Sequence, residues 1–355
     1  MDMRAARMHG YKQPLHIDEV QVPVPGPDEV LVKVLACGMC RSDYQLIDGY
    51  FPLDLTFPYI PGHEVAGEVA ELGSDVPGST GLSEGDRVVV NPAWGDGTCR
   101  QCHEGNEQLC TGSGGWIGFG PPGGFAEYVT VPSRHLIRID ADAGLEPHQL
   151  APLVDAGLTP YRGMKKLRAT GRLGPGRTVV VSGIGGLGSY GVQYAKLLGD
   201  GATVVAFARS DDKLDVARQN GADHTINTRG KTPDQMRAEL RELTGRGEID
   251  GALDCSGAPQ SLELNASLLG AEGALVSVGL MGTSVEFPIF LFVSGERTFS
   301  GSFWGNYNDL TEVLALAAQG RVKHTVTPVG LDDINDRLGA LGRGDVIGRQ
   351  VVVFD

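Results

Sequence analysis

Long hydrophobic runs are absent from this chain of 355 residues. Its longest apolar stretch, FPIFLFV at residues 287–293, is much shorter than the roughly 20 residues that cross a bilayer. The N-terminal segment MDMRAARMHGYKQ also has no apolar core of the kind that a secretory signal peptide carries. We therefore expect a cytoplasmic protein that does not bind membranes.

An excess of positive charge is absent as well, since 30 Lys and Arg residues face 44 Asp and Glu residues. The formal net charge of −14 repels the phosphates of nucleic acids and the headgroups of anionic lipids, so neither is an expected partner. Hydrophobic residues make up 41% and charged residues 21%, which is the usual balance of a globular protein. The length indicates two domains.

Cysteines are few, at six, but three of them gather in GDGTCRQCHEGNEQLC at residues 95–110. Thiols stay reduced in the cytoplasm, so clustered cysteines there indicate a metal site more than disulfides. A structural zinc ion takes four ligands. Cys99, Cys102 and Cys110 are therefore one ligand short of such a site, and another residue must complete it.

The pattern of short segments changes along the chain. The first 150 residues contain short strands broken by Pro and Gly, such as EVLVKVLACG at residues 29–38. After about residue 158, the strands TVVVSG, TVVAFA, HTIN, IDGALD and GALVSVG are mostly separated by helical segments, which predicts a parallel doubly wound sheet. An amphipathic helix at residues 308–320 and a closing strand, RQVVVFD, follow.

A glycine motif in the second region indicates dinucleotide binding. SGIGGLG places Gly183, Gly185, Gly186, Leu187 and Gly188 directly after a strand and at the start of a helix. The glycines permit a tight turn and a close backbone approach, so a pyrophosphate can lie at the helix N-terminus. A purely structural turn is the less favoured interpretation.

Two further motifs precede this region, CGMCRSD at residues 37–43 and PGHEVAGEV at residues 61–69. With the cysteine cluster, the glycine motif, APLVDAGLTPY at residues 151–161 and the final GRQVVV, they occur in a familiar order. The whole chain thereby resembles the zinc-dependent alcohol dehydrogenases of the medium-chain dehydrogenase/reductase superfamily.

The resemblance implies an α/β fold in which a Rossmann doubly wound parallel sheet is inserted in a mainly β, GroES-like catalytic domain. The catalytic domain would comprise residues 1–157 and 295–355, with a zinc lobe at about residues 94–112. Residues 158–294 would form the nucleotide-binding domain. A homodimer or homotetramer, joined through the edge strand of that domain, is also implied.

A catalytic zinc site follows from the same resemblance. Cys40 and His63 match two zinc ligands, and Asp155 is the candidate for the third. The resemblance implies that Asp43 orients His63 and that Glu64 lies beside the zinc ion.

Ser42 matches the hydroxyl that receives the proton of the alcohol while the zinc ion acts as a Lewis acid and hydride moves to the nicotinamide. Many relatives complete this proton relay with a histidine, where this chain has Gln45, so the last step would run through water or the cofactor ribose. Arg41 and Arg349 match positions that hold the cofactor pyrophosphate.

The resemblance also addresses the missing ligand in the cysteine cluster. The family spacing places Cys99, Cys102 and Cys110 in the last three positions, and the first position falls on Asp96, whose carboxylate is an acceptable zinc ligand. His103 is a competing ligand, but it directly follows Cys102 and would strain the loop. An empty, degenerate lobe is the alternative.

The predicted substrate pocket is aromatic, which favours an apolar secondary alcohol, ketone or aldehyde. Its predicted members are Tyr50, Phe51, Trp94, Trp116 and Trp304. A polyol or sugar dehydrogenase of the same superfamily is the alternative within enzymes. A non-catalytic nucleotide-binding protein on the same fold is a different class, and the intact set of catalytic residues argues against it.

The preferred cofactor is predicted from the residues that follow the second strand of the nucleotide region. NAD-specific folds place an acid about 20 residues beyond the glycine motif, where this chain has Ala208. Arg209 and Ser210 follow and can bind the 2′-phosphate of NADP, although Asp211 and Asp212 lie close enough to oppose it. We therefore expect NADP to be favoured modestly over NAD.

Overall fold

The computed structural model describes residues 1–112, 115–140 and 142–354. One unit consists of Met1–Asp155 and Asn306–Asp355, and the other is Ala156–Gly305. The second unit extends past the predicted end of the nucleotide-binding domain at residue 294, because Thr298–Gly301 pairs with its sheet.

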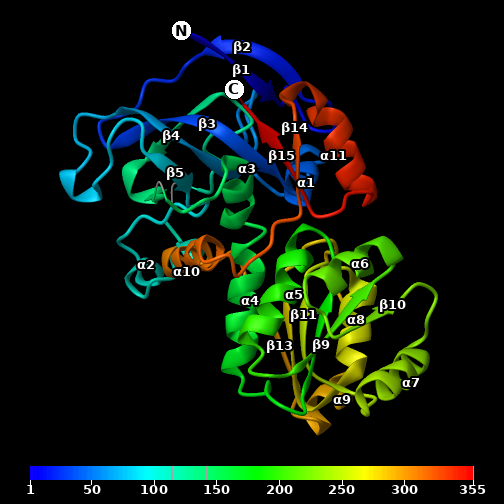
Figure 1. Cartoon of the computed structure of the whole chain (residues 1–355). Helices are drawn as coiled ribbons and strands as arrows, with labels where there is room; N and C mark the ends of the chain where they lie inside the picture. The colour runs from blue at the N-terminus through cyan, green and yellow to red at the C-terminus, as the bar shows by residue number, and fades with distance from the viewer. Residues whose placement is uncertain (113–114, 141, 355) are drawn as a thin grey trace. The chain divides into compact units, whose positions relative to one another are not determined.

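The first unit is built on a mainly antiparallel sheet, shown in Figure 1. Its strand order is β14 (Val326–Val329), β15 (Arg349–Val353), β3 (Glu29–Met39), β4 (Glu64–Leu72), β5 (Arg87–Val90) and β7 (Leu136–Arg138), and β6 (Tyr128–Pro132) also pairs with β3. Strands β1 (Asp2–Arg7) and β2 (His16–Gln21) form a separate hairpin. The alternating valines of β3 are buried, as the sequence pattern predicts.

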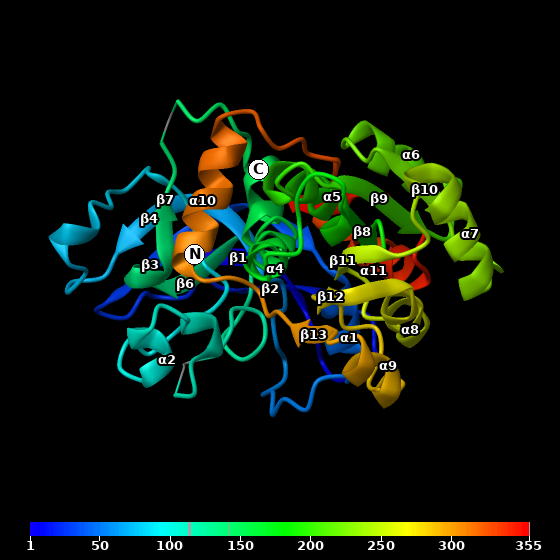
Figure 2. The same ribbon diagram turned by 90° about the horizontal axis from the view of Figure 1, so that it is seen from below.

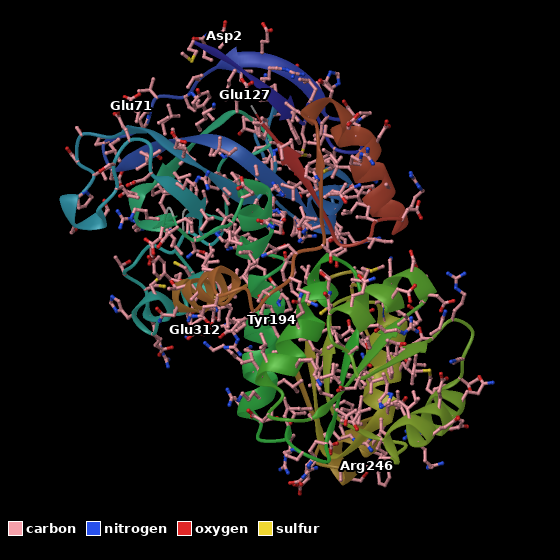
Figure 3. The ribbon with its side chains drawn as sticks, viewed as in Figure 1. Asp2, Glu71, Glu127, Tyr194, Arg246 and Glu312 are labelled. Carbon is pink, nitrogen blue, oxygen red and sulfur yellow. The ribbon has the colours of Figure 1, made fainter. Side chains whose placement is uncertain are left out.

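Short helices flank this sheet and place the candidate site residues. They are α1 (Arg41–Ile47), α2 (Arg100–His103), α3 (Pro147–Leu150), α10 (Tyr307–Ala318) and α11 (Ile334–Arg343). The predicted amphipathic helix is α10, which buries Leu310, Val313, Leu314 and Ala317. Glu312 lies on its exposed face (Figure 3).

The second unit contains a six-stranded sheet in which every neighbouring pair is parallel (Figure 2). Its order is β10 (His224–Asn227), β9 (Thr203–Ala208), β8 (Thr178–Ser182), β11 (Ile249–Asp254), β12 (Leu269–Ser277) and β13 (Thr298–Gly301). The chain moves outward from β8 to one edge and then returns past β8 to the other edge. This order confirms the predicted Rossmann fold.

Helices connect most of these parallel strands. They are α4 (Leu158–Ala169), α5 (Gly186–Leu198), α6 (Asp211–Gln219), α7 (Pro233–Thr244), α8 (Pro259–Leu268) and α9 (Ile289–Ser294). Local sequence fixes their ends: the Thr232 side chain accepts a hydrogen bond from the backbone N–H of Gln235 at the start of α7. Gly245, with φ 76°, ends this helix in the left-handed conformation. Among the helices of the described ranges, none is long and apolar enough to cross a membrane.

Candidate functional site

Three predicted metal ligands meet in the first unit. Cys40, His63 and Asp155 each offer a ligand atom, and these atoms all lie within 4.8 Å of one another. Cys40 follows β3 and His63 precedes β4, and because these strands are antiparallel partners, both residues lie at the same end of the pair. Asp155 directly follows the 3₁₀ turn at Ala151–Val154. We call these three residues the catalytic cluster, and all three are buried.

Asp43 fixes the orientation of His63. One carboxylate oxygen of Asp43 lies 3.0 Å from Nδ1 of His63, and the other accepts a hydrogen bond of 2.8 Å from the backbone N–H of Cys40. Nε2 of His63 therefore faces Oδ2 of Asp155, at 3.4 Å. An imidazole held in this way through Nδ1 presents Nε2 to a metal ion, so Asp43 lies where the resemblance predicts.

Glu64 and Arg349 form a buried ion pair beside the cluster. Nε of Arg349 donates to Oε1 of Glu64 at 3.1 Å, and Nη2 of Arg349 donates to Oδ2 of Asp155 at 3.0 Å. Burial raises the pKa of Glu64, and the positive charge of Arg349 opposes this shift and favours the carboxylate. Arg349 is only 3% exposed and lies against the catalytic cluster. A buried carboxylate needs a nearby cation, and Arg349 provides one. Its predicted contact with the pyrophosphate stays a prediction.

The charges in the site fit a bound cation. Asp43, Glu64 and Asp155 are buried together, and Arg349 is the guanidinium among them. Burial lowers the pKa of His63, but the negative charge of Asp43 and the hydrogen bonds with both aspartates outweigh burial and raise it well above its usual value. Thiolate, imidazole and carboxylate are donors that zinc accepts, and three protein ligands are typical of catalytic zinc.

The residues predicted to handle the proton and the pyrophosphate lie on α1. Ser42 and Arg41 occupy its first turn, directly after Cys40, and both are half-buried. Nη1 of Arg41 donates to the carbonyl oxygen of Leu341 near the end of α11, at 3.3 Å. Gln45, which stands where relatives carry a histidine, is half-buried on the same helix. The roles of these residues remain predictions.

An aromatic chain leads from the cluster. The ring of Phe119 lies 5.1 Å from that of His63 and 5.4 Å from that of Phe51, and Phe51 packs against Tyr50 at 5.2 Å. Phe119 was missed from the sequence, because the GWIGFG segment offered Trp116 as the more obvious aromatic residue.

The three tryptophans of the predicted pocket differ in their surroundings. Trp94 is buried and stacks on His135 at 5.8 Å, and Trp116 forms an isolated β-bridge with Ala93. Trp304 belongs to the second unit, where it packs against Phe303 at 5.0 Å. Its place in the substrate pocket stays a prediction.

A second cluster of ligand atoms lies in the metal lobe, residues 94–112. Asp96, Cys99, Cys102 and Cys110 offer ligand atoms within 4.8 Å of one another, and all four residues are half-buried. Oδ1 of Asp96 accepts hydrogen bonds from the backbone N–H groups of Thr98 and Cys99, which lower the pKa of its carboxyl group.

Backbone N–H groups of Cys102 and Thr111 lower the pKa of the Cys99 thiol to about 7. The competing ligand, His103, is exposed and is not a member of this lobe cluster. The four donors are of kinds that a closed structural zinc site uses, and their role as zinc ligands stays a prediction.

The metal lobe is attached to two other parts of the first unit. At one end, Nη2 of Arg134 donates to the carbonyl oxygen of Gly95 at 2.9 Å. At the other end, Nδ2 of Asn306 donates to the carbonyl oxygen of Gly105 at 2.7 Å, and Oε1 of Glu107 accepts from the backbone N–H of Tyr307. Asn306 and Tyr307 begin α10, so the lobe clamps the N-terminus of this helix.

The glycine motif adopts the conformation that a pyrophosphate-binding turn requires. Gly183 has φ 85°, and a Cβ atom on Gly188 would lie 2.2 Å from the carbonyl oxygen of Gly183. A Cβ atom on Gly185 would meet open space, so a ligand can approach the backbone there. Gly186 and Leu187 form the first turn of α5, a 13-residue helix whose N-terminus follows β8 directly. Gly183 and Gly188 thus have steric reasons to be glycine, and Gly185 leaves its backbone open to a ligand.

Comparisons with known proteins identify the family. Residues 26–141 match the alcohol dehydrogenase GroES-like domain, and residues 186–319 match the zinc-binding dehydrogenase domain. The chain is 34% identical to an NAD-dependent alcohol dehydrogenase of Sulfurisphaera tokodaii, over 99% of this chain and 100% of the relative. It is 33% identical to a D-arabinose 1-dehydrogenase (NADP(+)) of Saccharolobus solfataricus, over 98% and 97% of the two chains.

A solved structure is similar to this chain over nearly the whole length of both proteins. The alcohol dehydrogenase of Aeropyrum pernix is 36% identical and superposes with a TM-score of 0.91, covering 99% of this chain and 100% of that chain. The chain therefore belongs to the zinc-dependent alcohol dehydrogenase family of the medium-chain dehydrogenase/reductase superfamily, and it is an oxidoreductase.

Proposed function

We propose that this enzyme transfers hydride between a nicotinamide cofactor and a secondary alcohol or ketone at a zinc site formed by Cys40, His63 and Asp155. The observation that carries the proposal is the convergence of these three buried donors beside the aromatic rings of Phe119 and Phe51. A metal ion held there would have apolar surface next to its substrate side. Aldehydes are accommodated by the same chemistry.

Each residue of the site has a distinct task in this proposal. Zinc, when bound, supplies Lewis-acid polarisation of the substrate oxygen. Asp43 holds His63 in the tautomer that binds metal, while Arg349 balances the charge of Glu64 next to Asp155. Ser42, two residues after Cys40, takes the proton of the alcohol at its hydroxyl oxygen. With Gln45 in place of a titratable histidine, the proton then leaves through water or the cofactor ribose.

The substrate class is the point at which this proposal is tested. Several hydroxyl groups of a polyol would lack partners against an aromatic surface, and each buried unpaired group costs roughly 1–3 kcal/mol. We expect 2-alkanols and their ketones to give higher kcat/KM than sorbitol, glucose or D-arabinose. The sugar-dehydrogenase relative makes D-arabinose the most informative competitor. A higher kcat/KM with any of these sugars would replace the secondary-alcohol proposal with the sugar one.

We also propose that NADP is preferred over NAD. Ala208 is the last residue of β9, where an NAD-specific fold places the acid that binds the ribose 2′-hydroxyl, and the exposed Arg209 follows it. Ser210 precedes α6, next to Asp211 and Asp212, which oppose an anionic ligand. Relatives with NAD-dependent and NADP-dependent names both occur. The ratio of kcat/KM for NADP and NAD tests this preference, and a clear preference for NAD that Arg209→Ala leaves unchanged would contradict it.

A homodimer or homotetramer is the further proposal, with contact through the second unit. Strand β13 is the edge of the parallel sheet, and α9 exposes Ile289 by 79%, Phe290 by 83% and Val293 by 71%. Exposed apolar side chains of this size favour burial against a second copy. Light scattering of the wild type and of Phe290→Glu tests this, since a monomeric wild type would rule the oligomer out. We place the enzyme in the cytoplasm, where its six cysteines stay reduced.

A further inference from the structure

Arg229 lies beside Arg209 at one edge of the parallel sheet. Strands β9 and β10 are parallel neighbours, and their last residues, Ala208 and Asn227, are register partners. Arg209 and Arg229 therefore directly follow, or lie within two residues of, strand ends at the same, carboxyl-terminal edge of the sheet. Nε of Arg229 donates a hydrogen bond of 2.9 Å to the main-chain carbonyl oxygen of Arg209.

The backbone around Arg229 is anchored to the end of β9. The backbone N–H of Thr228 donates to the carbonyl oxygen of Ala208 at 2.8 Å, and the backbone N–H of Arg229 donates to Oδ1 of Asn227 at 3.0 Å. Arg229 is exposed, and within the described ranges its two Nη groups make no hydrogen bond. The hydrogen bond from Nε therefore positions the guanidinium of Arg229, and its two Nη groups remain available to bind an anion.

The carboxylates at this edge oppose a phosphate, so a further cation beside Arg209 would favour its binding. Asp211 and Asp212 form the first turn of α6, and a hydrogen bond from Ser210 lowers the pKa of Asp212. Nδ2 of Asn227 donates to Oδ1 of Asp211 at 2.9 Å, which holds that carboxylate close to the loop. Arg209 and Lys213 flank these two carboxylates in the sequence, and a phosphate adds about 1.5–2 negative charges. With Arg229, three positive and two negative side chains lie in this segment and its neighbouring turn.

We propose that Arg229 is a second ligand for the 2′-phosphate of NADP and determines cofactor specificity together with Arg209. This inference rests on the proposed preference for NADP. The Nη fork of Arg229 would donate two hydrogen bonds to the phosphate oxygens, while Arg209 binds the same group from the end of β9. Arg229 has no part in binding the adenine, the pyrophosphate or the nicotinamide.

The test measures the binding of two probes that differ only in the 2′-phosphate, 2′,5′-ADP and 5′-AMP. We expect the wild type to bind 2′,5′-ADP more tightly. Arg229→Ala should weaken 2′,5′-ADP binding roughly 10–100-fold, since hydrogen bonds to charged groups contribute about 1.5–3 kcal/mol, and it should leave 5′-AMP binding unchanged. Arg229→Gln retains a donor for the Arg209 carbonyl but removes the charge, so it should behave like Arg229→Ala.

Arg168→Ala is the matched control. Arg168 is exposed and pairs with Asp200, which precedes β9 and so lies at the opposite edge of the same sheet. This variant should bind both probes like the wild type. Equal weakening of both probes in Arg229→Ala would indicate only loop damage and overturn the proposal, as would an unchanged 2′,5′-ADP affinity.

The variant Arg209→Ala distinguishes a failure of the proposed role of Arg229 from a failure of the proposed NADP preference. If Arg209→Ala loses the preference for 2′,5′-ADP and Arg229→Ala retains it, NADP specificity stands without Arg229. If the wild type itself shows no preference for 2′,5′-ADP, the proposed cofactor preference fails, and the role of Arg229 fails with it.

Discussion

Cys40, His63 and Asp155 are at most 7% exposed, whereas the four donors of the metal lobe are all half-exposed. The buried cluster depends on other parts of the first unit, because Asp43 and Arg349 come from α1 and β15 to hold its ligands. The lobe cluster is local, since its donors lie within residues 96–110 and its carboxylate is held by the next backbone N–H groups. A catalytic ion needs ligands fixed by the whole fold, whereas a structural ion can itself fix a loop.

The largest expected effect comes from removing the carboxylate of the catalytic cluster. Asp155→Ala should lower kcat/KM by at least about 1,000-fold, because Lewis-acid stabilisation of several kcal/mol is lost with the ion. Metal analysis should find one zinc fewer per chain, with the lobe ion retained. Asp155→Cys is the control, since a thiolate is also a zinc ligand and should restore metal binding. Full zinc content and normal turnover in Asp155→Ala would exclude Asp155 as a ligand.

The second effect concerns the metal lobe, whose ion we expect to stabilise the fold without taking part in the reaction. Asp96→Ala should remove the lobe ion and lower the Tm by roughly 5 °C or more, while kcat/KM stays within about threefold at low temperature, because the lobe ligands form a group separate from the catalytic cluster. His103→Ala is the matched control from the same lobe and should change neither Tm nor zinc content. A wild type with one zinc per chain, or a zinc loss in His103→Ala instead, would contradict the assignment of Asp96.

The third effect depends on the exposure and the pKa of each thiol. After the metal is removed with a chelator, the half-exposed thiols of Cys99 and Cys110 should react with iodoacetamide at least about ten times faster than Cys37 and Cys40, which are buried. Burial raises the pKa of the Cys102 thiol to about 12, so Cys102 should react more slowly than Cys99 and Cys110. The low pKa of Cys99, about 7, should make it the first to react at neutral pH. Peptide mapping by mass spectrometry measures each rate. Equal rates for buried and lobe cysteines would mean that metal removal unfolds both regions together.

The smallest effect concerns His135, which stacks on Trp94 of the metal lobe. Burial and the neighbouring charge of Arg134 lower the pKa of His135 to about 3, whereas an unfolded histidine titrates near 6.5. Between these values the unfolded state binds more protons, so stability falls as the pH falls. The decrease from pH 6.5 to 5.5 should be about 1 kcal/mol, and His135→Gln should remove it. Denaturant unfolding at both pH values measures this, and an identical pH dependence in the variant would show that His135 does not cause it.

The sequence predicted local features better than features that depend on long-range packing. The parallel sheet, the glycine turn and the four donors of the lobe are encoded in short segments, and the structure brings each set together. The second unit of the structure runs beyond the predicted end at residue 294 and includes β13, a short strand without a strong apolar pattern. The contact of Arg349 with Asp155 joins residues 194 positions apart, and Phe119 contacts His63 from a different segment of the chain. Neither contact leaves a signal in local spacing.

The clamp between the metal lobe and α10 has a consequence for building hybrid enzymes. Glu107 and Gly105 hold the first residues of a helix that lies about 200 positions later in the chain. A transplanted lobe with another residue in place of Glu107 would lose the carboxylate that accepts from the backbone N–H of Tyr307, although the main-chain carbonyl at residue 105 could still accept from Asn306. The lobe and the start of α10 therefore form one exchangeable module, although the sequence separates them by an entire nucleotide-binding unit.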